Sequence, residues 1–216
     1  MEQLSPFTAT GGGSMSTLDL LVVYLRQRVR ARVLIPLALL LALSGWLLVP
    51  SAAFDARDFL AAAARAFLFI LAFRVWDDLE DRNADRASHP NRVMASSTRT
   101  APFLALVAIL TATAVISLLP LSEPLARCVA IALAVAVLSV WYSTRRSENW
   151  NRVAGGHIVL VKYPAIAYAV APSLPAASGF GRTAAVLGGL YALICIYEYV
   201  DDPDLRHVFL SRRSLP

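Results

Sequence analysis

One charged stretch organises this chain, and it reads Phe73-Arg-Val-Trp-Asp77-Asp78-Leu-Glu80-Asp81-Arg82-Asn-Ala-Asp85-Arg86-Ala-Ser-His89-Pro90-Asn-Arg92. It holds five acidic residues and four arginines, although only 16% of the 216 residues are charged. If the stretch is helical, Asp78, Asp81 and Asp85 are spaced three and four residues apart, so their carboxylates project from one face. Carboxylate oxygens suit Mg²⁺, which typically combines them with substrate phosphates. The interleaved arginines would meet the same phosphates as bidentate donors.

The composition predicts that a membrane surrounds this stretch. Mean hydropathy is +0.58 and 57% of the residues are hydrophobic, which is too apolar for a soluble domain. Several runs approach the roughly 20 residues that cross a bilayer. The formal charge of +5 comes from basic residues at the ends of these runs, which membrane topology explains better than nucleic-acid binding. We therefore expect an integral membrane protein of a bacterial inner membrane, with no nucleic-acid partner.

The order of polar and apolar segments predicts an all-α polytopic bundle. Residues 1–17 lack apolar periodicity and are expected to be a disordered lead, followed by one transmembrane domain over 18–216. Residues 18–32 predict an amphipathic helix on the membrane surface. Six spans follow, over residues 33–50, 59–76, 101–120, 125–142, 153–171 and 183–199. Arg65 lies inside the second span, where it must face a cavity or reach the surface.

The distribution of arginines orients this arrangement. Most of them flank the spans on one side, whereas the opposite loops offer only Arg57, Arg127 and Arg182. The positive-inside rule then places both termini and both acidic stretches in the cytoplasm.

A second acidic stretch follows the sixth span and opens on the same membrane face as the first. Glu198 lies three residues before Asp201 and four before Asp202, again on one helical face. Two such clusters could hold two Mg²⁺ ions that bridge a diphosphate and neutralise the charge of a leaving group. Lys162, inside the fifth span, is expected to point into the same cavity, with a phosphate as partner.

The residues from Asp77 to Arg86, followed by His89-Pro90-Asn-Arg92, resemble the first aspartate-rich motif of the UbiA superfamily of membrane prenyltransferases, written N-D-x-x-D-x-x-x-D. Asp77 stands where most members carry Asn. Trp141-Tyr142-Ser143 and the arginines after it also resemble the family's segment after the fourth helix.

The resemblance implies Mg²⁺-dependent ionisation of an allylic prenyl diphosphate and transfer of the prenyl group to an acceptor. It also implies that Asp78, Asp81 and Asp85 bind the Mg²⁺-diphosphate. The sequence departs from the family's pattern in two ways. Glu198-x-x-x-Asp202 replaces the family's second D-x-x-x-D motif, and we expect six spans in place of about nine, a UbiA-like fold with the last helices missing. A short active branch, an oligomer or partner subunit that completes the cavity wall, and a non-catalytic homologue are all compatible with this pattern.

The resulting prediction is a membrane prenyltransferase. Its catalytic residues are expected to be Asp78, Asp81, Asp85 and Asp202, with Glu198 and Asp201 as further metal ligands. The expected substrate contacts are Asp77, Arg82, Arg86, Arg92, Arg146 and Lys162. The alternatives are a membrane terpene cyclase, in which the same ionisation ends in ring closure, and a non-catalytic partner or scaffold. Acidic and arginine residues just outside a membrane helix also form ordinary solvated loops.

Overall fold

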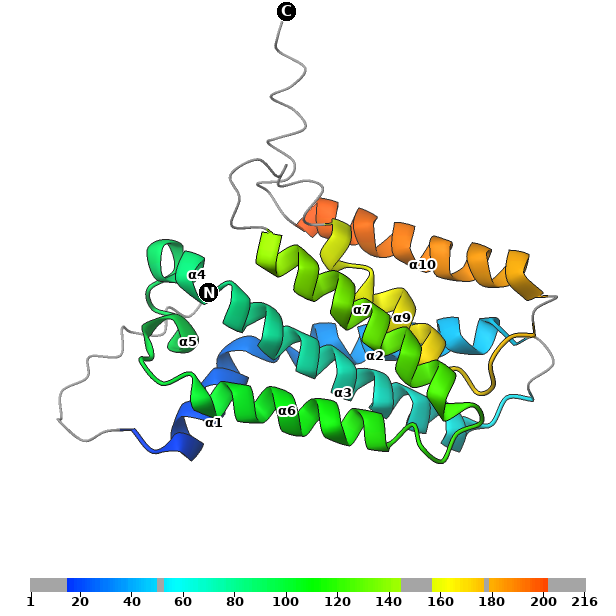
Figure 1. Cartoon of the computed structure of the whole chain (residues 1–216), viewed down its shortest axis with the longest axis horizontal. Coiled ribbons are helices and arrows are strands. Elements are labelled where there is room, and N and C mark those ends of the chain that lie inside the picture. Colours follow the sequence, from blue (N-terminus) through cyan, green and yellow to red (C-terminus); the bar gives the residue numbers. More distant parts are fainter. Residues whose placement is uncertain (1–14, 50–52, 145–156, 177–178, 202–216) are drawn as a thin grey trace, which may run out of the picture.

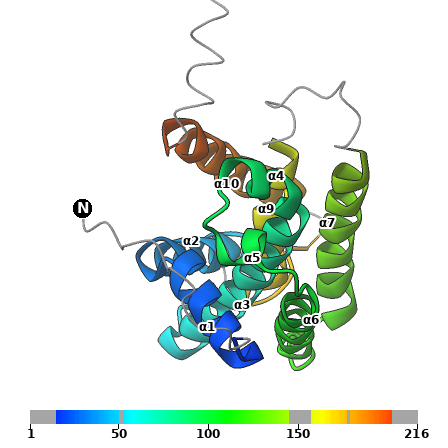
Figure 2. The ribbon, with the colours of Figure 1, turned by 90° about the vertical axis from the view of Figure 1, so that its left-hand side faces the viewer.

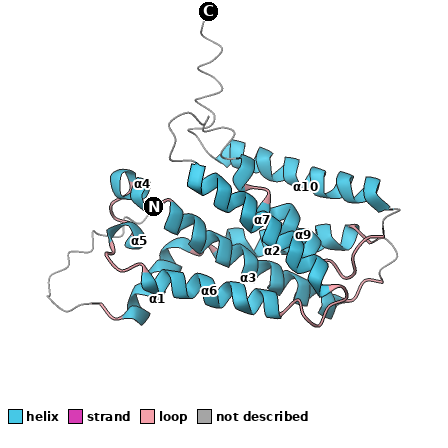
Figure 3. Cartoon of the chain, in the orientation of Figure 1, coloured by secondary structure: helices cyan, strands magenta, loops and turns pink. Residues whose placement is uncertain are grey.

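The computed structural model describes residues 15–49, 53–144, 157–176 and 179–201, and all regular structure within them is helical (Figure 3). The remaining residues, which include Arg146, Asp202 and most of the expected lead, lie outside this description. The helices of ten or more residues are α1 (Thr17–Arg28), α2 (Ala31–Leu47), α3 (Ala56–Glu80), α6 (Ala101–Ile116), α7 (Pro124–Thr144) and α10 (Phe180–Asp201). The shorter ones are α4 (Arg82–Ser88), α5 (Val93–Ser96) and α9 (Lys162–Ala169).

The long helices lie side by side, and α3 is central among them (Figures 1 and 2). It packs against α2, α6 and α9, while α7 and α10 pack against α9. Its amino terminus is capped by Asp55, whose carboxylate accepts a hydrogen bond from the amide of Asp58 at 2.9 Å. We call the end of the bundle that holds residues 77–85 the acidic end, and the opposite end the distal end. The short helices α4 and α5 lie at the acidic end (Figure 1).

By length and composition, α3, α7 and α10 could each cross a membrane. A fourth span is possible if α1 and α2, which meet at a bend of 74°, count as one broken span. Large apolar side chains cover the outer faces of these helices, among them Leu133 at 63% exposure and Ile196 at 61%. Such faces suit contact with lipid. The all-helical membrane fold therefore agrees with the sequence, and the count of six spans stays a prediction.

The fifth predicted span is interrupted in its described part. Residues 157–159 are helical, but a turn at 160–161 separates them from α9. Here Leu160, Val161 and Tyr163 each donate to the carbonyl three residues earlier, at 3.1–3.2 Å. Pro164 accounts for the break, because it has no N–H to donate to the Leu160 carbonyl and its ring crowds that group. The break places Lys162 at the first position of α9, beside the acidic end of α3.

The distal end is held by arginines that bond to backbone carbonyls. Arg127 is fully buried and donates to the carbonyls of Ser122, Ala169 and Ala171 at 2.6–2.8 Å. Arg65 donates to the carbonyl of Ser117 at 3.0 Å, which explains how its charge is tolerated inside α3. The carbonyls of Ser117, Ala169 and Ala171 lie at or just after the carboxyl ends of α6 and α9, where intrahelical donors run out, and that of Ser122 lies in the loop before α7. Both arginines therefore connect helix ends to the bundle.

Candidate functional site

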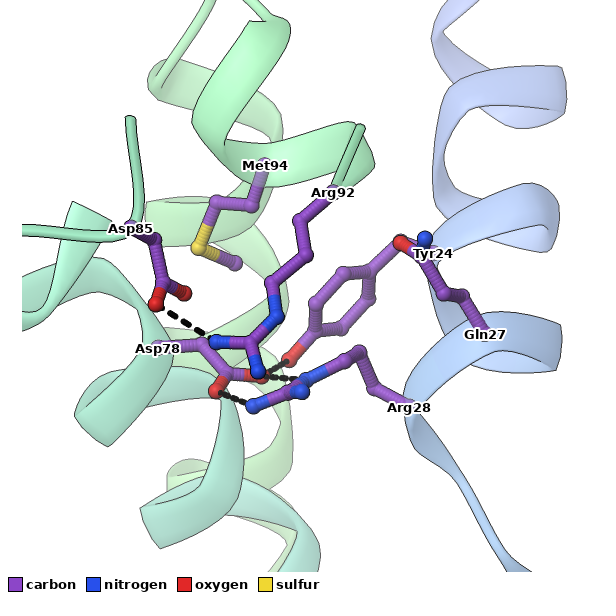
Figure 4. Close-up of a pocket in the computed structure, with 7 residues that line it drawn as sticks. All are labelled: Tyr24, Gln27, Arg28, Asp78, Asp85, Arg92 and Met94. Carbon is purple, nitrogen blue, oxygen red and sulfur yellow. Dashed lines mark hydrogen bonds and ion pairs between the residues drawn. The ribbon is translucent and has the colours of Figure 1, made fainter. Parts of the chain in front are cut away.

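Asp78 is the most enclosed carboxylate of the charged stretch, with a side chain that is 7% exposed. The Tyr24 hydroxyl donates to its Oδ2 at 2.9 Å, and Arg28 Nε donates to the same oxygen at 2.8 Å. Arg28 Nη2 bonds to Oδ1, so the guanidinium holds both carboxylate oxygens (Figure 4). Arg74 Nη2 lies 3.7 Å from Oδ1. Asp78 is thus fixed by α1, which the sequence predicted only as a surface helix.

Asp85 faces Asp78 across a small cavity (Figure 4). Arg92 Nη1 donates to Asp85 Oδ1 at 2.5 Å, and His89 Nδ1 lies 3.6 Å from that oxygen. This carboxylate cavity measures about 10 Å³, which is room for about one water molecule. Its lining residues are Tyr24, Gln27, Arg28, Asp78, Asp85, Arg92 and Met94.

The charged stretch does not form one continuous helical face. Helix α3 ends at Glu80 and α4 begins at Arg82, so Asp81 lies at the junction between them. Asp78 and Asp85 are therefore presented by different helices. Both carboxylates still line the carboxylate cavity, because α4 packs against α5. Arg28 and Arg92 fill the space between Asp78 and Asp85.

Arg82 and Arg86 attach α4 to α5. Arg82 Nε donates to the Met94 carbonyl at 3.0 Å and its Nη2 bonds to the carbonyl of Ser97. Arg86 Nε donates to the Ala95 carbonyl at 3.0 Å. Burial and the charge of Arg86 lower the pKa of Arg82 from its ordinary value. The structure places these two predicted diphosphate contacts in a structural junction beside the site.

Asp77 is not among the residues that line the carboxylate cavity, and it forms a pair with Lys162 of α9. The Tyr142 hydroxyl bonds to the other oxygen of the same carboxylate. Lys162 is 4% exposed, and its ammonium lies 5.9 Å from the centre of the Phe73 ring and 5.5 Å from that of Tyr163. Three helices, α3, α7 and α9, therefore meet at Asp77.

A large cavity of about 830 Å³ lies beside this pair, between α2, α3, α9 and α10. One part of its lining is strongly basic, with Arg28, Arg30, Arg32, Arg74, Arg92 and Lys162 against the two acids Asp77 and Glu198. The rest is mainly apolar, with Val33, Leu34, Pro36, Leu37, Leu40, Ile70, Tyr163, Leu193, Ile194 and Tyr197. The cavity is amphipathic: it can receive an anionic group and an apolar chain together.

The second predicted cluster reaches this cavity through Glu198. The structure places Glu198 with Asp77 and Lys162 on the lining of the large cavity, but the predicted metal ligands Asp78, Asp81 and Asp85 are not among the residues that line it. Asp201 is the last residue of α10, and its side chain, like Asp202 and Arg146, lies outside the described residues.

Of the predicted magnesium ligands whose side chains the structure describes, only Asp78 and Asp85 line the carboxylate cavity. Within the described parts of the chain, no group of three or more His, Cys, Asp or Glu side chains is placed to hold a metal ion. Two carboxylates, Asp78 and Asp85, nevertheless line one cavity of the size of a water molecule. One or two carboxylates are what Mg²⁺ typically takes from a protein when phosphates supply further ligands. The donor chemistry therefore fits, with Arg28 and Arg92 as the cations that neutralise these acids here.

Sequence reasoning missed the contribution of α1 and of the bend that follows it. Tyr24 and Arg28 are 54 and 50 residues from Asp78, and no local spacing connects them. Arg28, Arg30 and Arg32 were interpreted as topology signals. Their alternation just before an apolar run was the available indication that they form the basic end of a cavity.

Comparisons with family models, with curated proteins and with solved structures return no match for this chain. The resemblance to the UbiA superfamily therefore stays a prediction that depends on the residues of the motif.

Proposed function

We propose that this protein is a membrane prenyltransferase that binds an allylic prenyl diphosphate in the large cavity. The observation that carries the proposal is the division of that cavity into a basic part and an apolar part. A diphosphate group suits the basic residues, and a prenyl chain suits the apolar walls of α2 and α10. Its volume of about 830 Å³ lies within the range typical of ligand pockets.

The depth of the apolar part supports a chain-like ligand. Along α2 the apolar lining runs from Val33 to Leu40, whereas on α3 only Ile70 belongs to the apolar part. Val33 and Leu40 are seven residues apart, which corresponds to a rise of about 10 Å along a helix. Apolar contact of that length would exclude water from the chain and favour its burial. It would also hold the carbon attached to the diphosphate near the basic residues.

The chemistry that follows is ionisation and alkyl transfer. The bond between the allylic carbon and the diphosphate oxygen breaks, and the bonding electrons leave with the diphosphate. Arg74 and Lys162 line the cavity, and we expect them to neutralise the charge that develops on the leaving group. The rings of Tyr163 and Tyr197 line the apolar part, where their faces would stabilise the allylic cation. The acceptor then forms a bond to that carbon and releases a proton.

The predicted magnesium sites belong to this proposal. Asp78 and Asp85 would hold one ion, with Asp81 next to them, and Glu198, Asp201 and Asp202 would form the second site. A bound Mg²⁺ supplies further neutralisation of the departing diphosphate. The six-span arrangement with both termini in the cytoplasm is part of the same proposal.

The test is diphosphate release by the full chain in lipid nanodiscs, with farnesyl or geranylgeranyl diphosphate and with either Mg²⁺ or EDTA. We expect Mg²⁺-dependent release that is lost in Asp78→Ala. Arg57→Gln is the matched control. Arg57 is exposed in the first turn of α3 and lines neither cavity, so the change removes one charge far from the proposed site. Folded protein that neither binds nor ionises either substrate would overturn the proposal and favour a scaffold.

Product analysis separates the two enzymatic outcomes. Prenylated acceptor in a membrane extract indicates transfer, whereas a cyclic hydrocarbon without acceptor indicates a cyclase. We expect prenylated acceptor.

A further inference from the structure

The two cavities of the acidic end share a wall. Gln27, Arg28 and Arg92 line both the carboxylate cavity and the large cavity. Arg28 is 16% exposed and Arg92 is 29% exposed, so both guanidiniums lie at a boundary between enclosed acids and open space. The same two groups thus lie within reach of the carboxylates on one side and of any anion in the large cavity on the other.

The present partners of these arginines are the predicted metal ligands. Arg28 occupies both oxygens of Asp78, and Arg92 bonds to Asp85. An enclosed carboxylate needs a compensating cation, since an unpaired buried charge is strongly unfavourable. Phosphate oxygens accept the same bidentate hydrogen bonds from a guanidinium as a carboxylate does. An arginine could therefore change partner without losing its hydrogen bonds, provided that a second cation reaches the carboxylate.

We propose that Arg28 and Arg92 are diphosphate-binding residues that exchange partners when the substrate binds. Their guanidiniums turn from Asp78 and Asp85 to the diphosphate in the large cavity, and the released carboxylates bind the divalent cation. This inference rests on the proposed function. It assigns to Arg28, in a helix predicted to lie on the membrane surface, a direct contact with the substrate.

The bend between α1 and α2 places Arg28 at the end of a helix, beside both cavities. Arg28 is the last residue of α1, and the next residue, Val29, has an extended backbone that leads into the 74° bend. Tyr24 and Gln27 keep α1 in place through bonds to Asp78 and to the backbone of Val93. The Arg28 side chain can then turn while the helix stays where it is.

The exchange predicts opposite effects on two ligands, because the arginine competes with the metal and assists the anion. The experiment uses the full chain in nanodiscs and measures Mn²⁺ binding by electron paramagnetic resonance without any diphosphate. Farnesyl diphosphate binding is measured separately, with saturating Mg²⁺, which supplies the second cation that the exchange requires. In Arg28→Gln we expect Mn²⁺ to bind at least about fivefold more tightly and farnesyl diphosphate at least about fivefold more weakly, the lower limit for coupled sites.

The controls separate this role from a structural one. Arg26→Gln removes an exposed charge from the same helix, two residues from Arg28, and should change neither affinity. Arg92→Gln removes the cation that pairs with Asp85, so it should also tighten Mn²⁺ binding and weaken farnesyl diphosphate binding. This second variant keeps the test valid if Arg28→Gln fails to fold.

Unchanged or weaker Mn²⁺ binding in folded Arg28→Gln and Arg92→Gln, with wild-type protein that binds farnesyl diphosphate, would overturn the exchange alone. Wild-type protein that binds no farnesyl diphosphate, with or without Mn²⁺, would instead overturn the proposed function on which the exchange rests.

Discussion

Both ends of the helical bundle bury basic side chains, but they pair them with different groups. At the acidic end, Lys162 and Arg28 bond to the carboxylates of Asp77 and Asp78. At the distal end, Arg127 bonds to backbone carbonyls, including those of Ala169 and Ala171. Carbonyls at a helix end are structural acceptors that stay where the fold puts them. Carboxylates beside a cavity can instead exchange one cation for another.

The positions of the cavities agree with this difference. The residues that line one or the other cavity come from α1, α2, the acidic half of α3, α4, the segment around α5, the start of α9 and the last part of α10. Arg127 and Arg65 are not among the lining residues of either cavity. A buried charge in a membrane helix is therefore no sufficient sign of a functional site. A buried basic group that pairs with a carboxylate beside a cavity is a candidate for function, whereas one that bonds to backbone carbonyls away from a cavity is a structural connection.

The largest effect is expected at Lys162. Lys162→Met leaves the Asp77 carboxylate enclosed without its cation, and we expect the free energy of unfolding to fall by about 3–5 kcal/mol. Thermal unfolding in a mild detergent measures the loss. The double variant Lys162→Met/Asp77→Asn should recover most of it, because no buried charge remains. Equal losses in the single and double variants would show that the pair contributes through packing instead.

The next effect concerns the distal end and tests the comparison directly. Arg127→Met leaves the carbonyls of Ala169 and Ala171 without their donor, which should cost about 2–4 kcal/mol of stability. Protein that remains folded should bind farnesyl diphosphate as wild type does. Weaker binding at a temperature well below its unfolding midpoint would mean that the distal end is coupled to the cavity.

Gly45 tests how closely α2 approaches α9 near that same end. A Cβ at this position would lie 2.7 Å from the Ala167 carbonyl oxygen and 3.1 Å from the Cα of Ala171. Gly45→Ala should therefore destabilise the fold by about 1–3 kcal/mol through overpacking. Gly188→Ala is the matched control, since a Cβ there meets no atom within 4 Å. Equal unfolding temperatures for the two variants would contradict this close packing.

The smallest loss of stability is expected for Tyr24→Phe, a change at the acidic end. The change removes one hydrogen bond to Asp78 and leaves the bidentate contact from Arg28 in place. We expect a loss of about 1 kcal/mol in the free energy of unfolding. A loss as large as that of Lys162→Met would indicate that the tyrosine, not Arg28, chiefly holds α1 against the site.

Several features of the site could be predicted from local sequence. Lys162 was expected to face a cavity because an unpaired charge is unfavourable in hydrocarbon, and it does line the large cavity. Glu198 was expected near the first acidic stretch, and it lines that same cavity. Pro164 was a readable signal for the break before α9, although the fifth span was predicted as continuous.

Other features depended on contacts that local sequence does not encode. The spacing of Asp78, Asp81 and Asp85 predicted a single helical face, but α3 ends at Glu80 and the three residues belong to two helices and their junction. Arg82 and Arg86 looked equivalent to Arg92 in the sequence. In the structure they bond to carbonyls around α5, and only Arg92 lines the cavities.

The sequence by itself determined that the chain forms apolar helices with charges gathered at their ends, because hydropathy and periodicity act over a few neighbouring residues. Only the tertiary structure decided which charges meet. Arg28 reaches Asp78 across 50 residues, and Lys162 reaches Asp77 across 85. Such pairs depend on how α1, α3 and α9 pack, since buried charges select partners from whichever helices their neighbours bring close.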